Sequence, residues 1–370
     1  MTLKTHPAAG SRLNALRQAM AESQLDALLV TDIVNVGYVT GFSGSSGTAL
    51  ICDNRAIFVT DPRYAIQASE ECPHFEVVIS AGSRSTLPTI DNILSATPAI
   101  ATVGFESNIP YSEWQRYRDT LNSVSLVPTL NLVEHLRAIK DDDEIQKIRA
   151  AIKVAEGAFI SAIRWMRPGA TELEIAAAIE NAMRTAGASG PAFDTIAASG
   201  TMGAKPHHLA GKRSMESGEL LTLDWGAVVE GYCSDITRTV AIGSEAKLSE
   251  KHKDCYSRVL ESQQTAIAAM APGKTGAEID KAARDVLSKY GLDMHFTHST
   301  GHALGRVVHD GLIMSGTLGA WTLEPGMVLT VEPGIYIADW GGIRIEEDVL
   351  ITETGCEVLT QLPNMLQYFG

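Results

Sequence analysis

Acidic and histidine side chains in the C-terminal part of the sequence have the types and spacing of a metal site. The acids are Asp224, Asp235, Glu332 and Glu346. The histidines, in the dense spacing H-x3-H-x6-H, are His298, His302 and His309. Carboxylate oxygens bind divalent cations and can bridge a pair of them, and imidazole ligands favour manganese, cobalt, iron or zinc over magnesium. The sequence therefore predicts a site for one or two such ions.

Strand pairing would bring these acids together in two opposed pairs. A hairpin centred on residues 229–230 places Asp224 opposite Asp235, and a second hairpin places Glu332 opposite Glu346. Opposed residues on neighbouring strands have Cβ atoms about 4.5–5.5 Å apart, so two like charges there destabilise the hairpin. A bound cation is the best explanation for two such pairs.

Each group also has a simpler structural explanation. Asp224 and Asp235 alone could form the solvated face of a hairpin. His298 and His302 could be neighbours on an exposed helix, although Gly301 disfavours a regular helix there. The combination of two acid pairs with a histidine cluster favours the metal site.

The two acid pairs occupy matching positions in an internal repeat. Residues 167–175 and 271–279 share the pattern x-P-G-x-T-x-x-E-I. In this pattern Pro-Gly ends one element, and Thr with Glu closes a capping box on the next helix. Strand patterns follow in both halves, LTLDWG at 221–226 and LTVEPG at 329–334. We predict a duplicated α+β unit with a pseudo-two-fold relation.

The elements before the repeat have a different pattern. Residues 11–30 begin as an amphipathic helix and end in the apolar run 27–30. Further apolar runs follow at residues 48–52, 56–60 and 75–79. Strands alternating with helices indicate a small α/β domain. The polar stretch 139–145 precedes a long apolar-periodic helix, so we predict two domains, residues 1–135 and 136–370.

The composition narrows the class of function. The 370 residues include 44 acids and 30 bases, a net charge of −14 without a Lys/Arg-rich block, which argues against a nucleic-acid partner. The 5 cysteines lack CxxC spacing, which fits a reducing compartment. No stretch approaches the roughly 18–20 apolar residues of a membrane span, and the N-terminus has no apolar core of a secretory signal. We expect a cytoplasmic protein with no membrane partner.

Several segments carry a resemblance to known proteins. In the C-terminal part they are PHHLAGKR, LDWGAVVEGYCSDITRT, FTHSTGHALGRVVH, LEPGMVLTVEPGIY and GIRIEEDV. These resemble the pita-bread metallopeptidases, the group of methionine aminopeptidase, aminopeptidase P and prolidase. NVGYVTGFSGSSG and TDPRYAIQA resemble the creatinase/prolidase N-terminal domain. The resemblance covers nearly the whole chain and implies an α/β N-terminal domain followed by an α+β pita-bread catalytic domain.

The resemblance also implies a role for each candidate ligand. Asp235 and Glu346 would bridge two divalent metal ions. Asp224 would bind one ion, and His302 with Glu332 would bind the other. Manganese is the ion that the resemblance favours, with cobalt or zinc as alternatives.

Further residues receive roles by the same resemblance. Glu332 would also shuttle a proton, and His298 and His309 would stabilise the reaction intermediate or assist the leaving nitrogen. His207 would contact the substrate, although His208 adjoins it. Arg344 precedes Glu346 by two residues, so on a strand it points to the same face and could hold the bridging carboxylates by charge-assisted hydrogen bonds.

The two-domain members of this group mostly cleave Xaa-Pro bonds, in which the amide nitrogen carries no hydrogen. A prolidase needs a cation for the free carboxylate of its dipeptide. The arginine that some members carry four residues after the equivalent of His309 is Ile313 here. We therefore predict a Xaa-Pro aminopeptidase that acts on longer peptides, with Xaa-Pro dipeptidase as the alternative. Arg306, where the group often has an aliphatic residue, could change the charge of the pocket.

Two other classes of function share this fold. One is a hydrolase or lyase for a small non-peptide substrate, and the other is a binding module without activity. The intact ligand positions count against the binding module. The resemblance further implies a homodimer in which the N-terminal domain shapes the partner's site.

Overall fold

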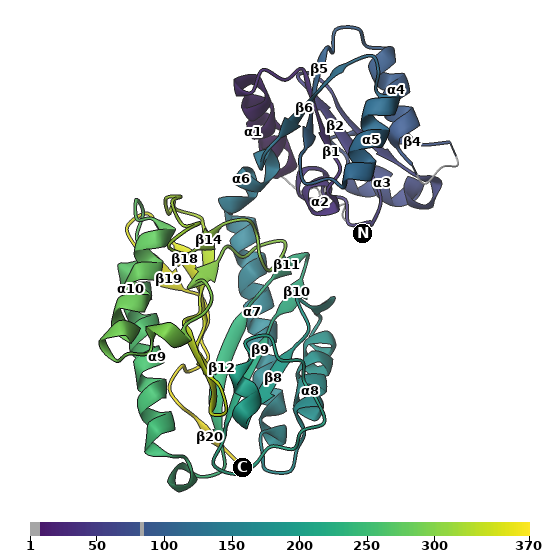
Figure 1. Cartoon of the computed structure of the whole chain (residues 1–370). Coiled ribbons are helices and arrows are strands. Elements are labelled where there is room, and N and C mark those ends of the chain that lie inside the picture. The colour runs from purple at the N-terminus through teal and green to yellow at the C-terminus, as the bar shows by residue number, and fades with distance from the viewer. Residues whose placement is uncertain (1–7, 82–84) are drawn as a thin grey trace. The chain divides into compact units, whose positions relative to one another are not determined.

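The computed structural model describes residues 8–81 and 85–370. Residues 1–7, part of the N-terminal stretch without an apolar core, lie outside the described residues. The chain forms two compact units, Met1–Arg137 and Ala138–Gly370 (Figure 1). None of the described helices combines the length and apolar character that crossing a membrane requires.

The first unit is built on a six-stranded sheet in the order β4-β3-β2-β1-β5-β6. Its strands are β1 (Ala27–Val30), β2 (Thr48–Cys52), β3 (Ala56–Thr60), β4 (Glu76–Ile79), β5 (Thr102–Glu106) and β6 (Ser125–Thr129). Its helices are α1 (Ala8–Glu22), α2 (Ile33–Thr40), α3 (Ala65–Glu71), α4 (Leu87–Ser95), α5 (Tyr111–Thr120) and α6 (Leu132–Ala138). Buried side chains of α1, α2 and α3 pack on one face of the sheet and those of α4 and α5 on the other. Because both faces are covered, β2 and β3 are buried throughout and are apolar except for Thr48 and Thr60, as the predicted α/β domain requires.

The second unit contains two halves, each of which runs from a pair of helices into a set of short strands. The first half comprises α7 (Asp142–Ala162), α8 (Glu172–Thr185), β7 (Gly190–Pro191), β8 (Ile196–Ser199), β9 (Leu220–Trp225), β10 (Ala227–Val229), β11 (Tyr232–Cys233) and β12 (Ile236–Ile242). The second half comprises α9 (Glu250–Ala269), α10 (Gly276–Lys289), β13 (Gly301–His302), β14 (Ile313–Met314), β15 (Val328–Val331), β16 (Gly334–Ile337), β17 (Gly341–Arg344), β18 (Glu347–Ile351) and β19 (Cys356–Val358). The final strand, β20 (Tyr368–Phe369), pairs with β12. Figure 1 shows the helix pairs α7–α8 and α9–α10 on opposite sides of the strands.

The caps of α8 and α10 confirm the repeat predicted from the sequence. Thr171 accepts a hydrogen bond from the backbone N–H of Glu174, whose carboxylate accepts one from the N–H of Thr171. Thr275 and Glu278 form the same capping box on α10. Each half therefore begins its second helix with the same local interaction, which fixes where the chain turns towards the strands.

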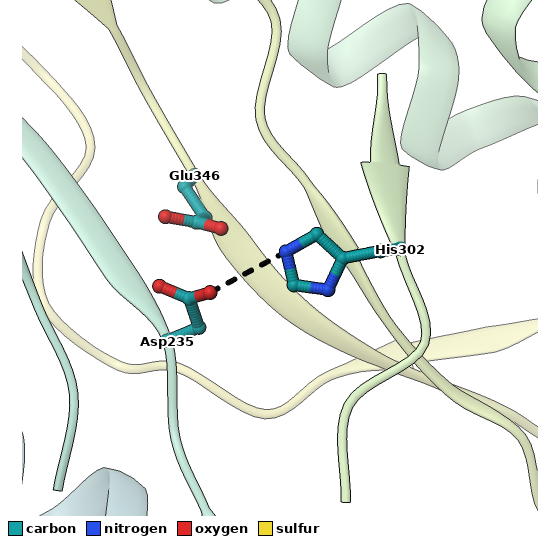
Figure 2. A group of neighbouring side chains, drawn as sticks. All are labelled: Asp235, His302 and Glu346. Atoms are coloured by element: carbon teal, nitrogen blue, oxygen red, sulfur yellow. Dashed lines mark ion pairs between the residues drawn. The ribbon is translucent and has the colours of Figure 1, made fainter. Parts of the chain in front are cut away.

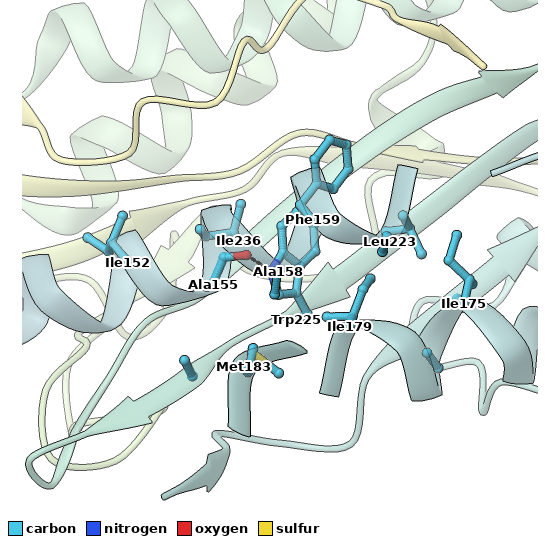
Figure 3. Close-up of a cluster of buried hydrophobic side chains, with 14 of the residues drawn as sticks. Ile152, Ala155, Ala158, Phe159, Ile175, Ile179, Met183, Leu223, Trp225 and Ile236 are labelled. Atoms are coloured by element: carbon cyan, nitrogen blue, oxygen red, sulfur yellow. Dashed lines mark hydrogen bonds between the residues drawn. The ribbon is translucent and has the colours of Figure 1, made fainter. Parts of the chain in front are cut away.

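A hydrophobic core joins the first helix pair to its sheet (Figure 3). The rings of Phe159 on α7 and Trp225 on β9 are stacked, with centroids 5.2 Å apart. The indole N–H of Trp225 donates to the carbonyl of Ala155, 2.9 Å away. This contact fixes the end of β9, the strand on which Asp224 lies.

The register of the second hairpin agrees with the prediction. β15 pairs with β18 so that Val331 lies opposite Glu347, and β16 pairs with β17 so that Gly334 lies opposite Arg344. The same register runs through both ladders. Between them it places Glu332 opposite Glu346.

The predicted register of the first hairpin is wrong by two residues. Asp224 on β9 lies opposite Thr237 on β12, and Asp235 precedes that strand. The cause is a tight turn between β10 and β11, in which Glu230 and Gly231 adopt φ values of 49° and 79°. Such two-residue turns match the twist of a hairpin. Because side chains alternate with a period of two, this shift leaves Asp224 and Asp235 on the same face.

The turn at Gly231 yields a prediction about stability. Replacing Gly231 by Ala should lower the free energy of unfolding by about 1–2 kcal/mol, because an L-residue is strained in the left-handed region. As the matched control, Gly157→Ala on the exposed surface of α7, where an added Cβ has nothing within 4 Å, should raise it by about 1 kcal/mol. Urea unfolding measures both. Changes of the same sign in the two variants would contradict this account of the turn.

Candidate metal centre

One cavity of about 520 Å³ in the second unit is lined by all the site residues predicted from the sequence. The predicted metal ligands in its wall are Asp224, Asp235, His302, Glu332 and Glu346. The other predicted residues in its wall are His207, His298, His309 and Arg344. A cavity of this volume is within the range of small-molecule sites, about 300–1,000 Å³.

Three of the predicted ligands converge in the cavity wall. Asp235, just before β12, and Glu346, between β17 and β18, face the ring of His302 from β13 (Figure 2). One ligand atom of each lies within 4.8 Å of the others, and all three side chains are buried. Glu332 extends the group, since its Oε1 lies 3.4 Å from Nε2 of His302.

Burial and mutual repulsion act together on these acids. Burial, and then the charge of Glu346, raises the pKa of Asp235 well above its usual range. Burial likewise raises the pKa of Glu346 well above normal, with Glu332 adding to the effect. A buried carboxylate is stable in its charged form only when a compensating charge lies close to it. Divalent cations between these acids would supply that charge.

His302 presents the electron pair that a metal ligand needs. Its Nδ1–H donates to the carbonyl of Ala303 at 3.2 Å, so Nε2 carries the lone pair. Nε2 lies 3.5 Å from Oδ2 of Asp235. Burial and the nearby His309 lower the pKa of His302 to about 3, which keeps the ring neutral. The Nε2 nitrogen of the neutral ring and the carboxylate oxygens all donate electron pairs, so they cannot bond to one another. A bound cation can accept electron pairs from all of them.

The two carboxylate oxygens of Asp224 differ in their contacts. Its Oδ2 accepts a hydrogen bond from the guanidinium of Arg344 at 2.6 Å, while its Oδ1 is buried and has no hydrogen-bond partner among the described residues. A buried carboxylate oxygen without a donor is costly. An ion bound through Oδ1 would remove that cost, which is a second observation in favour of a metal here.

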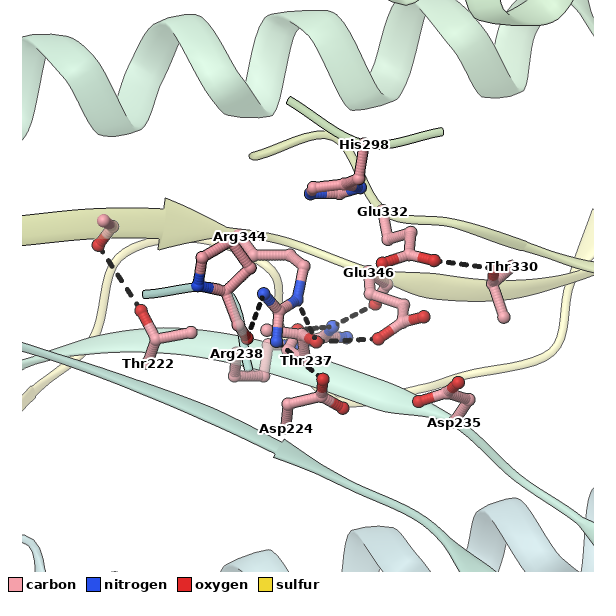
Figure 4. A network of polar contacts seen from close by, with 12 residues as sticks. Thr222, Asp224, Asp235, Thr237, Arg238, His298, Thr330, Glu332, Arg344 and Glu346 are labelled. Carbon is pink, nitrogen blue, oxygen red and sulfur yellow. Dashed lines mark hydrogen bonds and ion pairs between the residues drawn. The ribbon is translucent and has the colours of Figure 1, made fainter. Parts of the chain in front are cut away.

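Arg344 joins Asp224 to a chain of polar contacts (Figure 4). Its guanidinium donates to the hydroxyl of Tyr336 at 2.7 Å, and that hydroxyl lies 2.8 Å from Nε2 of His298. The Nδ1–H of His298 donates to the carbonyl of Ser299, so Nε2 accepts from Tyr336. Burial and the charge of Arg344 lower the pKa of His298 to about 4, in agreement with a neutral ring.

The contacts of Arg344 differ in part from the prediction. We predicted that it holds the bridging carboxylates, and its direct ion pair is with Asp224 instead. Its Nε donates to the hydroxyl of Thr237, which in turn donates to Glu346 at 2.7 Å. The two-residue shift of the first hairpin explains this, because it places Thr237 between Arg344 and the second acid pair.

The remaining histidines of the region, His207, His208 and His309, differ in the contacts that their side chains make. His208 lies 2.9 Å from the buried carboxylate of Glu172 and is not part of the cavity wall. His207 lines the cavity. His309 is exposed, and its ring lies edge-on to that of His302 with centroids 4.1 Å apart. Thus His207 and His309 are available to a ligand and His208 is not.

The residues that hold the ligands in place were not predicted from the sequence. The buried side chains of Arg238 and Glu347 form an ion pair at 3.0 Å, and Arg238 also donates to the backbone carbonyl of Glu346. Asp348 accepts from the backbone N–H of Asp235. Tyr336 could have been found from the period of two, because it lies four residues after Glu332 in the sequence. The other contacts depend on strand pairing that a sequence pattern does not contain.

The fold and the site together define a class of protein. Two matching halves, with a buried group of acids and a histidine between their strands, are the pita-bread arrangement of a metal-dependent hydrolase. A model of metallopeptidase family M24 matches residues 146–353, and one of the Creatinase/Prolidase N-terminal domain matches residues 12–139. The chain therefore belongs to metallopeptidase family M24, as the resemblance in its sequence implied.

Individual relatives share nearly the full length of the chain. A Xaa-Pro dipeptidase of Pyrococcus furiosus is 36% identical over 95% of this chain and 97% of its own. The structure of a Xaa-Pro dipeptidase from Bacillus anthracis has a TM-score of 0.93 and 38% identity, over 98% of this chain and 100% of that one. The structure of an X-Pro aminopeptidase from Thermotoga maritima has a TM-score of 0.87 and 37% identity, over 95% and 99% of the two chains.

The ligand geometry predicts a loss of bound metal on substitution. Replacing His302 by Gln should remove most of the bound manganese from protein reconstituted with excess Mn²⁺ and desalted, because the neutral nitrogen among the carboxylates is lost. Elemental analysis by mass spectrometry measures the metal per chain. The control is His74→Gln, at an exposed position in the first unit, which should bind as much metal as the unmodified protein. Equal metal content in both variants would contradict the assignment of His302.

Proposed function

We propose that this M24 metallopeptidase is a Xaa-Pro dipeptidase, which hydrolyses the bond between the two residues of a dipeptide that ends in proline. The observation that carries the proposal is the donor set of the cavity, four acids and one neutral histidine. The chain is similar over nearly its full length to two proteins named Xaa-Pro dipeptidase, and this similarity supports the choice of substrate. This choice replaces the aminopeptidase that we favoured from the sequence.

The proposed site holds two divalent ions, for which manganese suits a mixture of carboxylates and imidazole. Bound ions of this kind polarise the scissile carbonyl and activate a water molecule. Asp224, Asp235 and Glu346 would hold these ions through their carboxylates. His302 and Glu332 would complete the ligand set.

Proton transfer is assigned to Glu332. The nitrogen of a prolyl bond carries no hydrogen, so it must gain a proton as the bond breaks. The carboxylate of Glu332 lies in the cavity wall, 3.4 Å from both Nε2 of His302 and the hydroxyl of Thr330. We propose that it accepts the proton of the attacking water and delivers it to the proline nitrogen.

The three histidines of the cavity wall outside the ligand set have different proposed roles towards the substrate. In the described structure both ring nitrogens of His298 are engaged, one with Tyr336 and one with a backbone carbonyl. His309 has an exposed ring at the cavity. We therefore propose His309 as the hydrogen-bond donor to the developing oxyanion and His207 as a substrate contact. His298 would act by orienting Tyr336 and Arg344.

The assignment of Glu332 as the proton carrier predicts a loss of activity when its carboxylate is removed. Glu332→Gln should lower kcat for Ala-Pro by about 10²–10⁴-fold, the usual contribution of general acid–base catalysis. Activity is measured by proline release after loading with Mn²⁺, and EDTA should abolish it. Glu324→Gln, which removes a carboxylate outside the cavity, serves as the control and should leave kcat unchanged. Equal kcat for Glu332→Gln and the unmodified enzyme would contradict the assignment.

A Xaa-Pro aminopeptidase is the second candidate. It is supported by the similarity to the Thermotoga maritima enzyme and by Ile313, which stands where some members of the group carry a cation. The two activities are separated by comparing Ala-Pro with Ala-Pro-Ala at equal concentration. We expect a higher kcat/KM for Ala-Pro. A preference for the tripeptide would replace the dipeptidase by the aminopeptidase, and no cleavage of either by metal-loaded protein would exclude both.

A further inference from the structure

We propose that the guanidinium of Arg306 binds the free carboxylate of a dipeptide substrate and thereby makes the site selective for dipeptides. The proposal rests on the dipeptidase function and deepens it by naming the residue that recognises the end of the substrate. Arg306 lies in the segment between β13 and β14, and its side chain lines the same cavity as the metal ligands.

The cavity contains a second arginine, but that residue is already engaged. Of the described residues that line the cavity, the permanently charged cations are Arg306 and Arg344. Arg344 forms an ion pair with Asp224 at 2.6 Å and also donates to Tyr336. It is therefore held in the catalytic network and cannot turn towards a substrate carboxylate without breaking that pair.

Arg306 has no such acidic partner among the described residues. Its Nε is buried and has no hydrogen-bond partner in the part of the chain that the structure describes. The nearby acid Asp310 accepts from the backbone N–H of Arg306 at 3.2 Å. A buried guanidinium nitrogen without an acceptor is unfavourable, and a carboxylate is the acceptor that matches its fork of donors.

The position of the guanidinium is supported from one side. Its central carbon lies 5.5 Å from the centre of the Tyr232 ring, at a distance where a cation is attracted to an aromatic face. Tyr232 is itself buried on β11 and donates to Glu144 at 2.8 Å. Gly231, which has no side chain, leaves room beside the guanidinium. The hairpin of β10 and β11 thus forms a platform for Arg306.

The rest of the wall suits a proline residue. Arg306 lies four residues after His302 and three before His309, and all three side chains reach the cavity. Val307, Val308 and neighbouring apolar side chains supply a surface for the pyrrolidine ring. By contrast, Ile313 on β14 pairs with His302 on β13 and is not among the described residues that line the cavity. The cation that is missing at position 313 is therefore supplied from position 306.

The test compares an acid substrate with its amide. Ala-Pro and Ala-Pro-amide differ by the charge that Arg306 is proposed to bind. In Arg306→Met we expect KM for Ala-Pro to rise about 10- to 100-fold, the usual effect of losing a hydrogen bond to a charged group, with KM for the amide unchanged. Arg306→Lys should recover part of the loss, because it restores the charge without the fork.

Controls separate this inference from the proposed function. Arg164→Met, at an exposed position outside the cavity, should change neither KM. If the unmodified enzyme cleaves Ala-Pro but Arg306→Met raises KM equally for acid and amide, the role of Arg306 is refuted and the dipeptidase function stands. If the metal-loaded enzyme cleaves neither substrate, both proposals fail.

A measurement on the unmodified enzyme guards against a variant that does not fold. Free proline should inhibit cleavage of Ala-Pro at a concentration about 10- to 100-fold lower than prolinamide does, since only proline carries the carboxylate. Equal inhibition by the two compounds would refute the role of Arg306 without any substitution.

Discussion

The interaction on which the catalytic unit depends is the electrostatic repulsion among its buried acids. Asp235, Glu346 and their neighbours are removed from water in one cavity, where carboxylates raise one another's pKa. A fold does not tolerate such a group without compensation. Arg344 compensates one acid, Asp224, and the neutral His302 compensates none. The remaining demand for positive charge is what makes the cavity a site for divalent ions.

The duplicated fold creates this demand by placing acids at equivalent ends of its strands. Neither half has enough ligands by itself, because β9 and the start of β12 supply two aspartates and the second half supplies two glutamates with His302. The halves are tied together by buried contacts near the ligands. Thr237 of the first half donates to Glu346 of the second, and Arg238 donates to the backbone of the same residue. Packing of the halves and formation of the ligand set are therefore one event.

Patterns of residues predicted the local structure around this cavity where short stretches of sequence determine it. The capping boxes at Thr171 and Thr275 and the register that opposes Glu332 to Glu346 follow from local sequence. The first hairpin was misjudged because its turn at Glu230 and Gly231 depends on backbone angles that the pattern leaves open. The error was harmless because a shift of two residues preserves the face of a strand. Contacts such as that of Arg344 with Asp224 join segments that are far apart in the sequence. They can be identified only once the chain has folded.

The same distinction bears on the choice between the two proposed activities. The lack of a cation at residue 313 favoured an aminopeptidase only if that position faces the substrate. In the structure the cavity wall instead includes Arg306, held against Tyr232 with a buried nitrogen that lacks an acceptor. Among the described residues none of the four acids in the wall forms an ion pair with Arg306, so its guanidinium needs another reason to lie there. Recognition of a free substrate carboxylate supplies that reason, whereas a longer peptide would place a neutral amide beside Arg306.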